Sequence, residues 1–195
     1  MFNRKKCEDK KDEELVSLTL KDQDYYYCLV EKYEKKPLRY IMRISSATQE
    51  DAEDILQEVF IKVYKNLYNF DVSLKFSSWI YRITHNQTIS HYRKLKARPQ
   101  TIDSDKNEII LEMIRSDDDI IKKMDNKILR KNIDKSLAKI NIKYREVLIL
   151  RFFEEKDYNE MSDILQKPLG TVATLINRAK KKLKEELINN TPYVK

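Results

Sequence analysis

Apolar side chains recur every three to four residues through most of the chain, the pattern of amphipathic helices. The longest such stripe is formed by Ala52, Ile55, Leu56, Val59, Phe60, Val63, Tyr64 and Leu67. Thr48 precedes this stripe, with Asp51 three residues later, so we expect Thr48 to cap the helix. The pattern predicts an all-helical protein in which one face of each helix enters a core.

The same spacing predicts further helices in the first half of the chain. They run from about Asp12 to Leu20, from Asp22 to Ile44, and from Ser77 to Lys96. Pro37 has no backbone N–H, so the second of these helices should kink or break there. The loop "YNFDVSLKF", residues 68–76, precedes the last of them.

The composition shifts to acids and small polar residues between 98 and 125, which predicts a flexible linker. We therefore expect two small helical domains, residues 1–97 and 126–195. In the second, "NKILRKNIDKSLAKIN" is amphipathic, whereas "YREVLILRFF" is apolar nearly all round and predicts a central buried helix.

The end of the chain has the order of a helix-turn-helix. "DYNEMSDILQ" predicts a short helix with Asp157 as its N-cap, and "KPLG" predicts a turn around the only Gly of the chain. "TVATLINRAKKKLKEEL" follows as a long helix with an apolar stripe. On its opposite side lie Thr174, Asn177, Arg178 and Lys181.

These polar side chains suit a DNA major groove, because Arg and Asn can bond base edges while Lys contacts phosphates. Lys180, Lys182 and Lys184 could neutralise further phosphates. A solvated basic helix on an ordinary bundle explains the same pattern. The preceding all-round apolar helix favours DNA reading, since a three-helix DNA-binding unit needs a buried support.

Aromatic and basic residues gather around residues 68–98. We expect Tyr68 and Phe70 to be exposed, whereas Phe76 and Trp79 either fill the core or stack on bases, with the core favoured. Asn86 either ties down the loop or reads a base. The helix then ends in a basic segment, "SHYRKLKAR", which includes Arg93 and Lys94.

Bulk composition limits the function classes. The net charge of +7 suggests a polyanionic partner, yet Asp54, Gln57 and Glu58 form an acidic face whose partner should be a basic protein surface. One Gly in 195 residues excludes Gly-rich phosphate loops and dinucleotide fingerprints.

No catalytic or cofactor site is expected. Cys7 and Cys28 have no paired spacing and are interpreted as free thiols, and His85 and His91 are isolated, so we expect no enzyme activity, metal or cofactor. No apolar run approaches the roughly 20 residues of a membrane span, which predicts a cytoplasmic protein without membrane insertion.

Three segments together resemble the extracytoplasmic-function (ECF) group of bacterial RNA polymerase sigma factors. "DAEDILQEVFIKVYKNL" is similar to the family's region 2.2, and "NFDVSLKFSSWIYRITHNQTISHYRK" to regions 2.3 and 2.4. "YREVLILRFFEEKDYNEMSDILQKPLGTVATLINRAKKKL" resembles region 4. The resemblance covers about Asp12 to Leu187, nearly the whole chain.

The resemblance implies a promoter-specificity subunit that performs no chemistry. Its partners would be the RNA polymerase core, through the beta-prime clamp helices and the beta subunit, promoter DNA, and in some systems an anti-sigma factor. Asp54, Gln57 and Glu58 would contact the clamp helices. The loop around Phe70, together with Asn86, would capture a base flipped from the minus-ten element.

The helix from Thr171 would then read the minus-thirty-five element. The family usually continues Gly-Thr-Val with a cation, Ser and Arg, where this chain has Ala173, Thr174 and Leu175, so two of the family's positive side chains are missing here. Two other classes stay open from the residues alone: a stand-alone helix-turn-helix regulator and a helical protein-binding adaptor.

Overall fold

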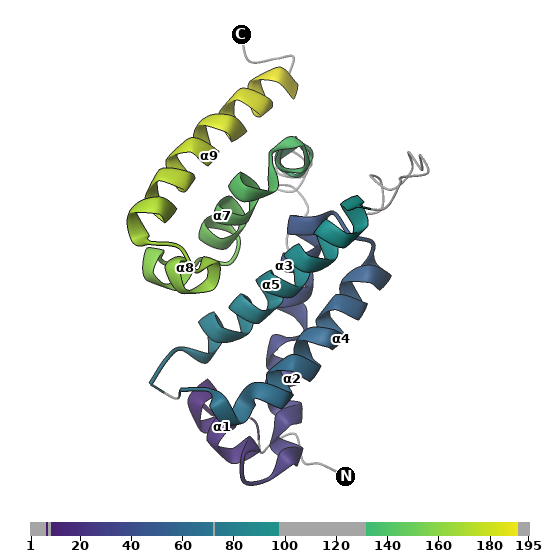
Figure 1. Ribbon diagram of the computed structural model, residues 1–195, viewed down its shortest axis with the longest axis vertical. Coiled ribbons are helices and arrows are strands. Elements are labelled where there is room, and N and C mark those ends of the chain that lie inside the picture. Colours follow the sequence, from purple (N-terminus) through teal and green to yellow (C-terminus); the bar gives the residue numbers. More distant parts are fainter. Residues whose placement is uncertain (1–6, 8, 72, 98–131, 191–195) are drawn as a thin grey trace, which may run out of the picture.

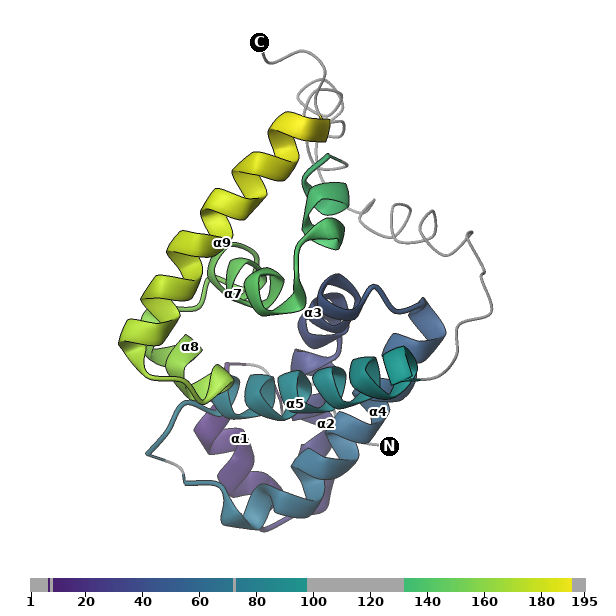
Figure 2. The ribbon, with the colours of Figure 1, turned by 45° about the horizontal axis from the view of Figure 1, so that its top comes forward.

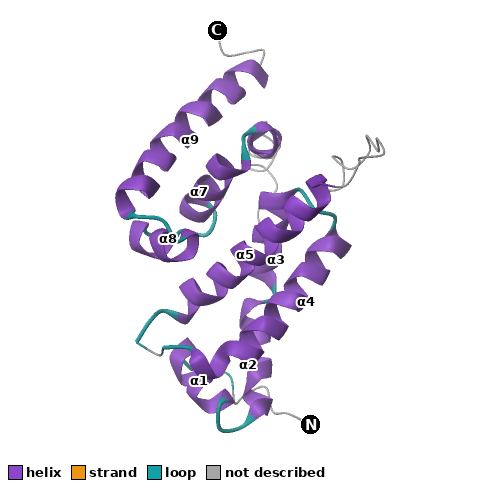
Figure 3. Ribbon diagram, viewed as in Figure 1, coloured by secondary structure: helices purple, strands orange, loops and turns teal. Residues whose placement is uncertain are grey.

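The computed structural model describes residues 7, 9–71, 73–97 and 132–190, and all regular elements within them are helices (Figure 3). The predicted all-helical fold is confirmed for this part of the chain. The predicted linker, 98–125, and the first residues of the helix expected from 126 lie outside the described residues. Of the helices that are described, none combines the length and the apolar character that a membrane span requires.

The first half of the chain forms one helical unit (Figure 1). Its elements are α1 (Asp12–Thr19), η2 (Gln23–Tyr25), α2 (Tyr26–Tyr33), α3 (Lys35–Ser45), α4 (Gln49–Asn66), η3 (Leu67–Asn69) and α5 (Phe76–Ala97). Helices α3, α4 and α5 pack against one another, and α1 and α2 close one end.

The predicted break near Pro37 is confirmed. The chain leaves α2 at Tyr33 and enters α3 at Lys35. In a continuous helix the Pro37 ring would clash with the carbonyl of Tyr33 four residues earlier, so the interruption falls one turn before the proline. Pro37 itself lies in the first turn of α3, where no backbone N–H is needed.

Helix α4 begins as predicted. The Thr48 side chain accepts a hydrogen bond from the backbone N–H of Asp51, and the stripe from Ala52 to Val63 is buried except for the half-buried Phe60. Tyr64 departs from the predicted stripe, because its side chain is exposed and meets the edge of the Tyr26 ring, with centroids 5.0 Å apart.

The second unit contains helical residues 132–139, α7 (Ile142–Phe152), α8 (Tyr158–Leu165) and α9 (Leu169–Asn190). Six consecutive residues of α7, from Arg145 to Leu150, are buried, which confirms the predicted central helix. Helix α9 packs against both α7 and α8 and lies at the outer edge of the molecule (Figure 2).

The turn between α8 and α9 differs from the prediction in its glycine. Asp157 caps α8 as predicted, in a reciprocal arrangement with Glu160. The left-handed residue that ends α8 is Gln166, whereas Gly170 lies in the first turn of α9. The helix therefore begins at Leu169, two residues before the predicted start, and the turn does not depend on glycine.

The prediction of two free thiols is wrong: Cys7 and Cys28 form a disulfide. The bond links the chain before α1 to the first turn of α2. The 21-residue separation gives no signal in the sequence, because the two cysteines meet only after α1 folds back on α2.

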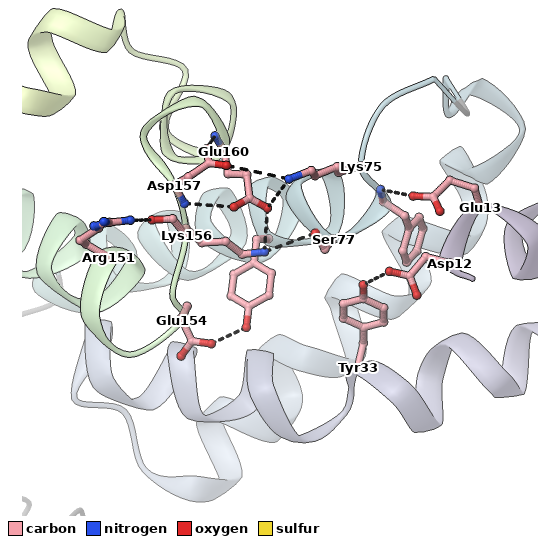
Figure 4. Close-up of polar contacts among 12 residues, drawn as sticks. Asp12, Glu13, Tyr33, Lys75, Ser77, Arg151, Glu154, Lys156, Asp157 and Glu160 are labelled. Atoms are coloured by element: carbon pink, nitrogen blue, oxygen red, sulfur yellow. Dashed lines mark hydrogen bonds and ion pairs between the residues drawn. The ribbon is translucent and has the colours of Figure 1, made fainter. Parts of the chain in front are cut away.

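The two units pack together through polar side chains, with α8 against α5 and α7 against α3. Figure 4 shows the centre of this contact, where the Tyr81 hydroxyl donates to the Glu154 carboxylate and Lys156 donates to Ser77. The Lys156 ammonium also lies 4.9 Å from the centroid of the Tyr81 ring. At the other side of Glu154, an Arg43 nitrogen lies 3.7 Å from the carboxylate.

Arg145 of α7 caps a helix of the other unit. One guanidinium nitrogen donates to the carbonyl of Ile44, 2.9 Å away, and to the hydroxyl of Ser46, 3.1 Å away. The other donates to the carbonyls of Ala138 and Ile140. The last carbonyls of a helix lack intrahelical partners and carry the negative end of its dipole, so a buried cation is held there without an acid.

His85 of α5 and Glu146 of α7 form a second buried contact between the units. Their nearest atoms, Nε2 and Oε2, are 3.7 Å apart, and the Tyr40 hydroxyl lies 3.0 Å from the other ring nitrogen. Burial, helped by the charges of Lys167 and Arg93, lowers the pKa of His85 to about 4. Burial raises the pKa of Glu146 to about 7, although Lys167 opposes this shift.

Replacing Arg145 with Met should lower the free energy of unfolding by about 2 kcal/mol, because buried acceptors in both units lose their donor. Urea unfolding of the full chain measures this. Arg178→Met, on an exposed face, is the matched control and should change stability by less than about 0.5 kcal/mol. Equal effects of the two substitutions would contradict the capping role.

The His85–Glu146 pair predicts a pH effect. Between pH 4.5 and 6.5 the folded pair and the unfolded pair each bind one proton, so the pair adds no pH dependence to stability. In His85→Gln only Glu146 remains. The pKa of Glu146 is higher in the folded chain than in the unfolded chain. Its protonation therefore stabilises the folded chain fully below pH 4.5, and this stabilisation is lost as the pH rises to about 7.

The difference in unfolding free energy between His85→Gln and the unchanged chain should therefore grow as pH rises through this range. The slope should approach about 1.4 kcal/mol per pH unit at most. Denaturant unfolding at several pH values checks it. A pH-independent difference would show that Glu146 titrates normally in the folded chain.

Candidate nucleic-acid interface

The acidic residues of α4 lie where the sequence predicted. Asp54, Gln57 and Glu58 are exposed, whereas their neighbours Ile55 and Leu56 are buried in the core. The Glu58 carboxylate accepts a hydrogen bond from the side-chain amide of Gln87 on α5. The face is therefore available to a partner and also touches the neighbouring helix.

A groove of about 410 Å³ runs between α4, η3 and α5. It is lined by Lys62, Asn66, Asn69, Trp79, Arg82, Ile83, Asn86, Gln87 and Ser90. One aromatic ring, one aliphatic side chain, two cations and several amides thus share a single concave surface.

Phe70 does not lie in the groove but supports it. The prediction that Phe70 is exposed is wrong, since only 7% of it is accessible to solvent. Its ring packs 5.0 Å from the centroid of Trp79 and 5.5 Å from that of Phe76. Phe76 is fully buried, as favoured from the sequence, whereas the half-buried Trp79 serves both the core and the groove.

Tyr68 and Asn86 are placed to meet a ligand. Tyr68 is 84% exposed on η3, which confirms the prediction for this residue, and the next residue, Asn69, lines the groove. Asn86 is exposed and lines the groove. Arg93 and Lys94 are exposed farther along α5.

Most of the groove's polar lining was not singled out from the sequence. The missed residues are Lys62, Asn66, Asn69 and Gln87. A signal existed, because Arg82, Asn86 and Ser90 recur every four residues on α5, as Lys62 and Asn66 do on α4. What the spacing did not show is that these two polar rows face each other.

The outer face of α9 carries the predicted set. Thr171, Thr174, Asn177, Arg178 and Lys181 are all exposed. Among the described residues no acid forms an ion pair with Arg178, whereas the charge of Lys181 helps to lower the pKa of Glu185, one turn later. Two other lysines are already engaged: Lys180 lies 5.4 Å from the Phe152 ring and Lys182 pairs with Glu185 at 2.8 Å.

The groove has the chemistry of a site for an unstacked nucleobase. A ring face can stack on any base, cations attract the phosphate backbone, and amides can bond base edges. The α9 face instead presents a donor-rich helix surface, which suits the major groove of a duplex. The two surfaces belong to different units of the chain.

Phe70→Ala should lower the free energy of unfolding by about 3 kcal/mol, because it removes a buried ring from an aromatic cluster. Tyr68→Ala, two residues earlier and exposed, should change it by less than about 0.5 kcal/mol. Thermal or urea unfolding of the two variants distinguishes them. Equal destabilisation would mean that Phe70 is not part of the core.

Two family models match the chain, and both describe sigma factors. Residues 29–98 match Sigma-70 region 2, and residues 130–183 match Sigma-70, region 4. The first match includes the groove and the acidic face, and the second includes α7, α8 and most of α9.

Similar proteins of several bacteria span nearly the same length. The ECF RNA polymerase sigma factor SigW of Bacillus subtilis (strain 168) is 33% identical over 175 residues, which cover 85% of this chain and 90% of SigW. The RNA polymerase sigma-H factor of Pseudomonas aeruginosa is 32% identical, over 90% of this chain and 93% of that protein. The ECF sigma-E factor of Escherichia coli (strain K12) is 28% identical, over 87% of this chain and 90% of that protein.

Solved structures show the same fold. CnrH, solved in complex with the cytosolic domain of CnrY, aligns with a TM-score of 0.67 over 92% of this chain and 99% of that chain, at 21% identity. RpoE of Bartonella quintana, solved with the anti-sigma factor NepR, aligns with a TM-score of 0.56 over 77% of this chain and 89% of that chain, at 20% identity. With regions 2 and 4 in order and relatives matched over nearly their full length, the chain belongs to the ECF group of RNA polymerase sigma factors.

Proposed function

We propose that this sigma factor divides promoter recognition among three surfaces. The acidic face of α4 binds the polymerase core, the groove between α4 and α5 takes a base of the minus-ten element, and the outer face of α9 reads the minus-thirty-five element. Sigma factors direct RNA polymerase to promoters and have no catalytic activity, so each surface is a binding site. We assign these surfaces to residues 1–97 and 126–195, with 98–125 as the linker.

The observation that carries the proposal is the groove. Within one concavity it combines a half-buried Trp79 ring with Lys62, Arg82 and the amide of Asn86. A base turned out of the duplex can stack on the ring and bond the amide, while the cations contact the adjoining phosphates. Tyr68, Arg93 and Lys94 extend this surface, and Phe70 acts by holding Trp79 in place.

The acidic face fits a protein partner, because it would repel DNA. Asp54, Gln57 and Glu58 are exposed on α4 beyond its first turn, so the helix dipole does not explain them. The family resemblance assigns them to the beta-prime clamp helices, with further core contacts to the beta subunit. Thus, α4 presents acids to the polymerase and a cation to the groove.

Region 4 supports a duplex contact of moderate strength. Thr171, Thr174, Asn177, Arg178 and Lys181 share the exposed face of α9. Leu175 instead packs against the core, and Ala173 brings no charge, so these positions add no phosphate contact. Minus-thirty-five binding should accordingly depend on Arg178 and Lys181.

We also propose that an anti-sigma factor binds this chain and that it acts in the cytoplasm, where it meets the polymerase. The support is that CnrH and RpoE, which share its fold, were solved with the cytosolic domain of CnrY and with the anti-sigma factor NepR. In this chain α5 and α8 pack against each other, so one partner could contact both units.

Run-off transcription with purified core polymerase on a promoter library, with and without this chain, tests the function. We expect transcripts from a subset of promoters only when the chain is added. Tight duplex binding without polymerase would indicate a stand-alone helix-turn-helix regulator. Transcription that is independent of DNA sequence would indicate a protein-binding adaptor.

Asp54→Lys should weaken core binding at least about ten-fold, because it places a cation against a basic partner. Glu34→Lys makes the same charge change at the exposed junction of α2 and α3 and should leave core affinity unchanged. Titration of labelled chain with core polymerase measures both. Equal affinities for the two variants would remove α4 from the core interface.

A further inference from the structure

We propose that Gln87 is a specificity-determining residue of the groove and that Glu58, on the polymerase-binding face, fixes the orientation of its amide. The proposal rests on the function proposed above and goes beyond it. Hydrogen bonds among Glu58, Gln87 and Lys62 connect the protein-binding surface of α4 to the DNA-binding groove.

The contacts form a chain across two helices. The Nε2 group of Gln87 on α5 donates to Oε2 of Glu58 on α4, and Nζ of Lys62, also on α4, donates to Oε1 of Gln87. Glu58 and Lys62 lie one helical turn apart, so both reach the same amide. Gln87 is half-buried, and it and Lys62 line the groove, whereas Glu58 does not.

This arrangement removes an ambiguity that amides normally have. The two ends of a glutamine amide have nearly the same shape, and in most surroundings the group can turn over. A carboxylate only accepts hydrogen bonds and an ammonium group only donates them. Turning the Gln87 amide over would place its NH₂ against Lys62 and its oxygen against Glu58, losing both bonds.

A fixed amide can discriminate between bases. After these two contacts, Gln87 keeps one N–H donor and one acceptor lone pair, at defined positions on the groove wall. A base whose edge offers the complementary acceptor and donor is favoured, and one with the reverse pattern meets unpaired polar groups. A freely turning amide would adapt to both patterns.

Glu58 therefore acts as a positioning residue for DNA recognition. Among the described side chains, only Gln87 is bonded to its carboxylate, through Oε2, which leaves Oε1 for a cation of the polymerase. The polymerase contact and the Gln87 contact are thus compatible. A substitution at Glu58 should change base preference even though its side chain does not line the groove.

The test measures base preference in holoenzyme formed at saturating concentrations of each full-length variant. The readout is binding to fork DNA in which each position of the minus-ten strand is varied in turn. Gln87→Met should reduce discrimination at one position by about three- to ten-fold, the effect of one hydrogen bond. Glu58→Ala should reduce discrimination at that same position, and the double variant should add nothing.

Two further variants separate positioning from charge. Glu50→Ala removes the same charge two turns earlier on α4, without a contact to Gln87, and should leave base preference unchanged. Glu58→Gln keeps a carbonyl acceptor for Gln87 and should retain most of the discrimination.

An unchanged preference in Gln87→Met, or equal changes in Glu58→Ala and Glu50→Ala, would overturn the inference. Asn86→Ala distinguishes a failure of the role proposed for Gln87 from a failure of the base-binding function proposed for the groove. If Asn86→Ala alters base preference while Gln87→Met does not, the groove is still the base site and only the role of Gln87 is wrong. If neither variant alters it at any position, the groove does not bind the base and the proposed function fails as well.

Discussion

Helix α5 is shared by both units, and this constraint organises the molecule. Phe76, Ile80, Thr84 and Thr88 recur every four residues and are fully buried. Tyr81 and His85 face the second unit, whereas Trp79 and Asn86 face the groove. Three faces of this helix thus contact the core of the first unit, the second unit and the groove, and few of its positions can change without affecting a neighbouring residue.

The two buried threonines of α5 show how polar side chains are accommodated in the core of the first unit. Thr84 donates its hydroxyl to the carbonyl of Ile80, and Thr88 donates to that of Thr84, so neither hydroxyl is left without a partner. The second unit is then held by polar groups such as Arg145, Glu154 and Glu146. Since such groups can also be satisfied by water, separation of the units would not leave them without hydrogen-bond partners.

Local features of the fold could be predicted from the sequence. The cap at Thr48, the cap at Asp157 and the break before Pro37 depend on residues within four positions of one another, and all three are confirmed. Likewise, the exposure of Asp54 and Arg178 follows from helical periodicity. Features that join distant segments were missed or misjudged, because spacing along one helix does not reveal which helix it meets.

Phe70, Cys28 and Arg145 are examples of such distant contacts. Phe70 was expected at the surface because it lies in a loop, yet it folds under Trp79 of the next helix. Cys28 meets Cys7 across α1, and Arg145 meets Ile44 across the interface between units. For the groove, the sequence indicated Trp79 and Asn86 but not the opposing row on α4, and it is that opposition which makes the surface concave.

The scarcity of glycine has a consequence for the energetics of the whole chain. Ser46, Glu155 and Gln166 occupy left-handed backbone conformations, each at a cost of roughly 1 kcal/mol relative to glycine. In exchange, the unfolded chain contains almost no residues of unusually high backbone freedom, so less entropy is lost when it folds. The backbone strain at these few turns is therefore offset by the lower conformational entropy of the unfolded chain. This stabilisation does not arise from any contact in the folded structure.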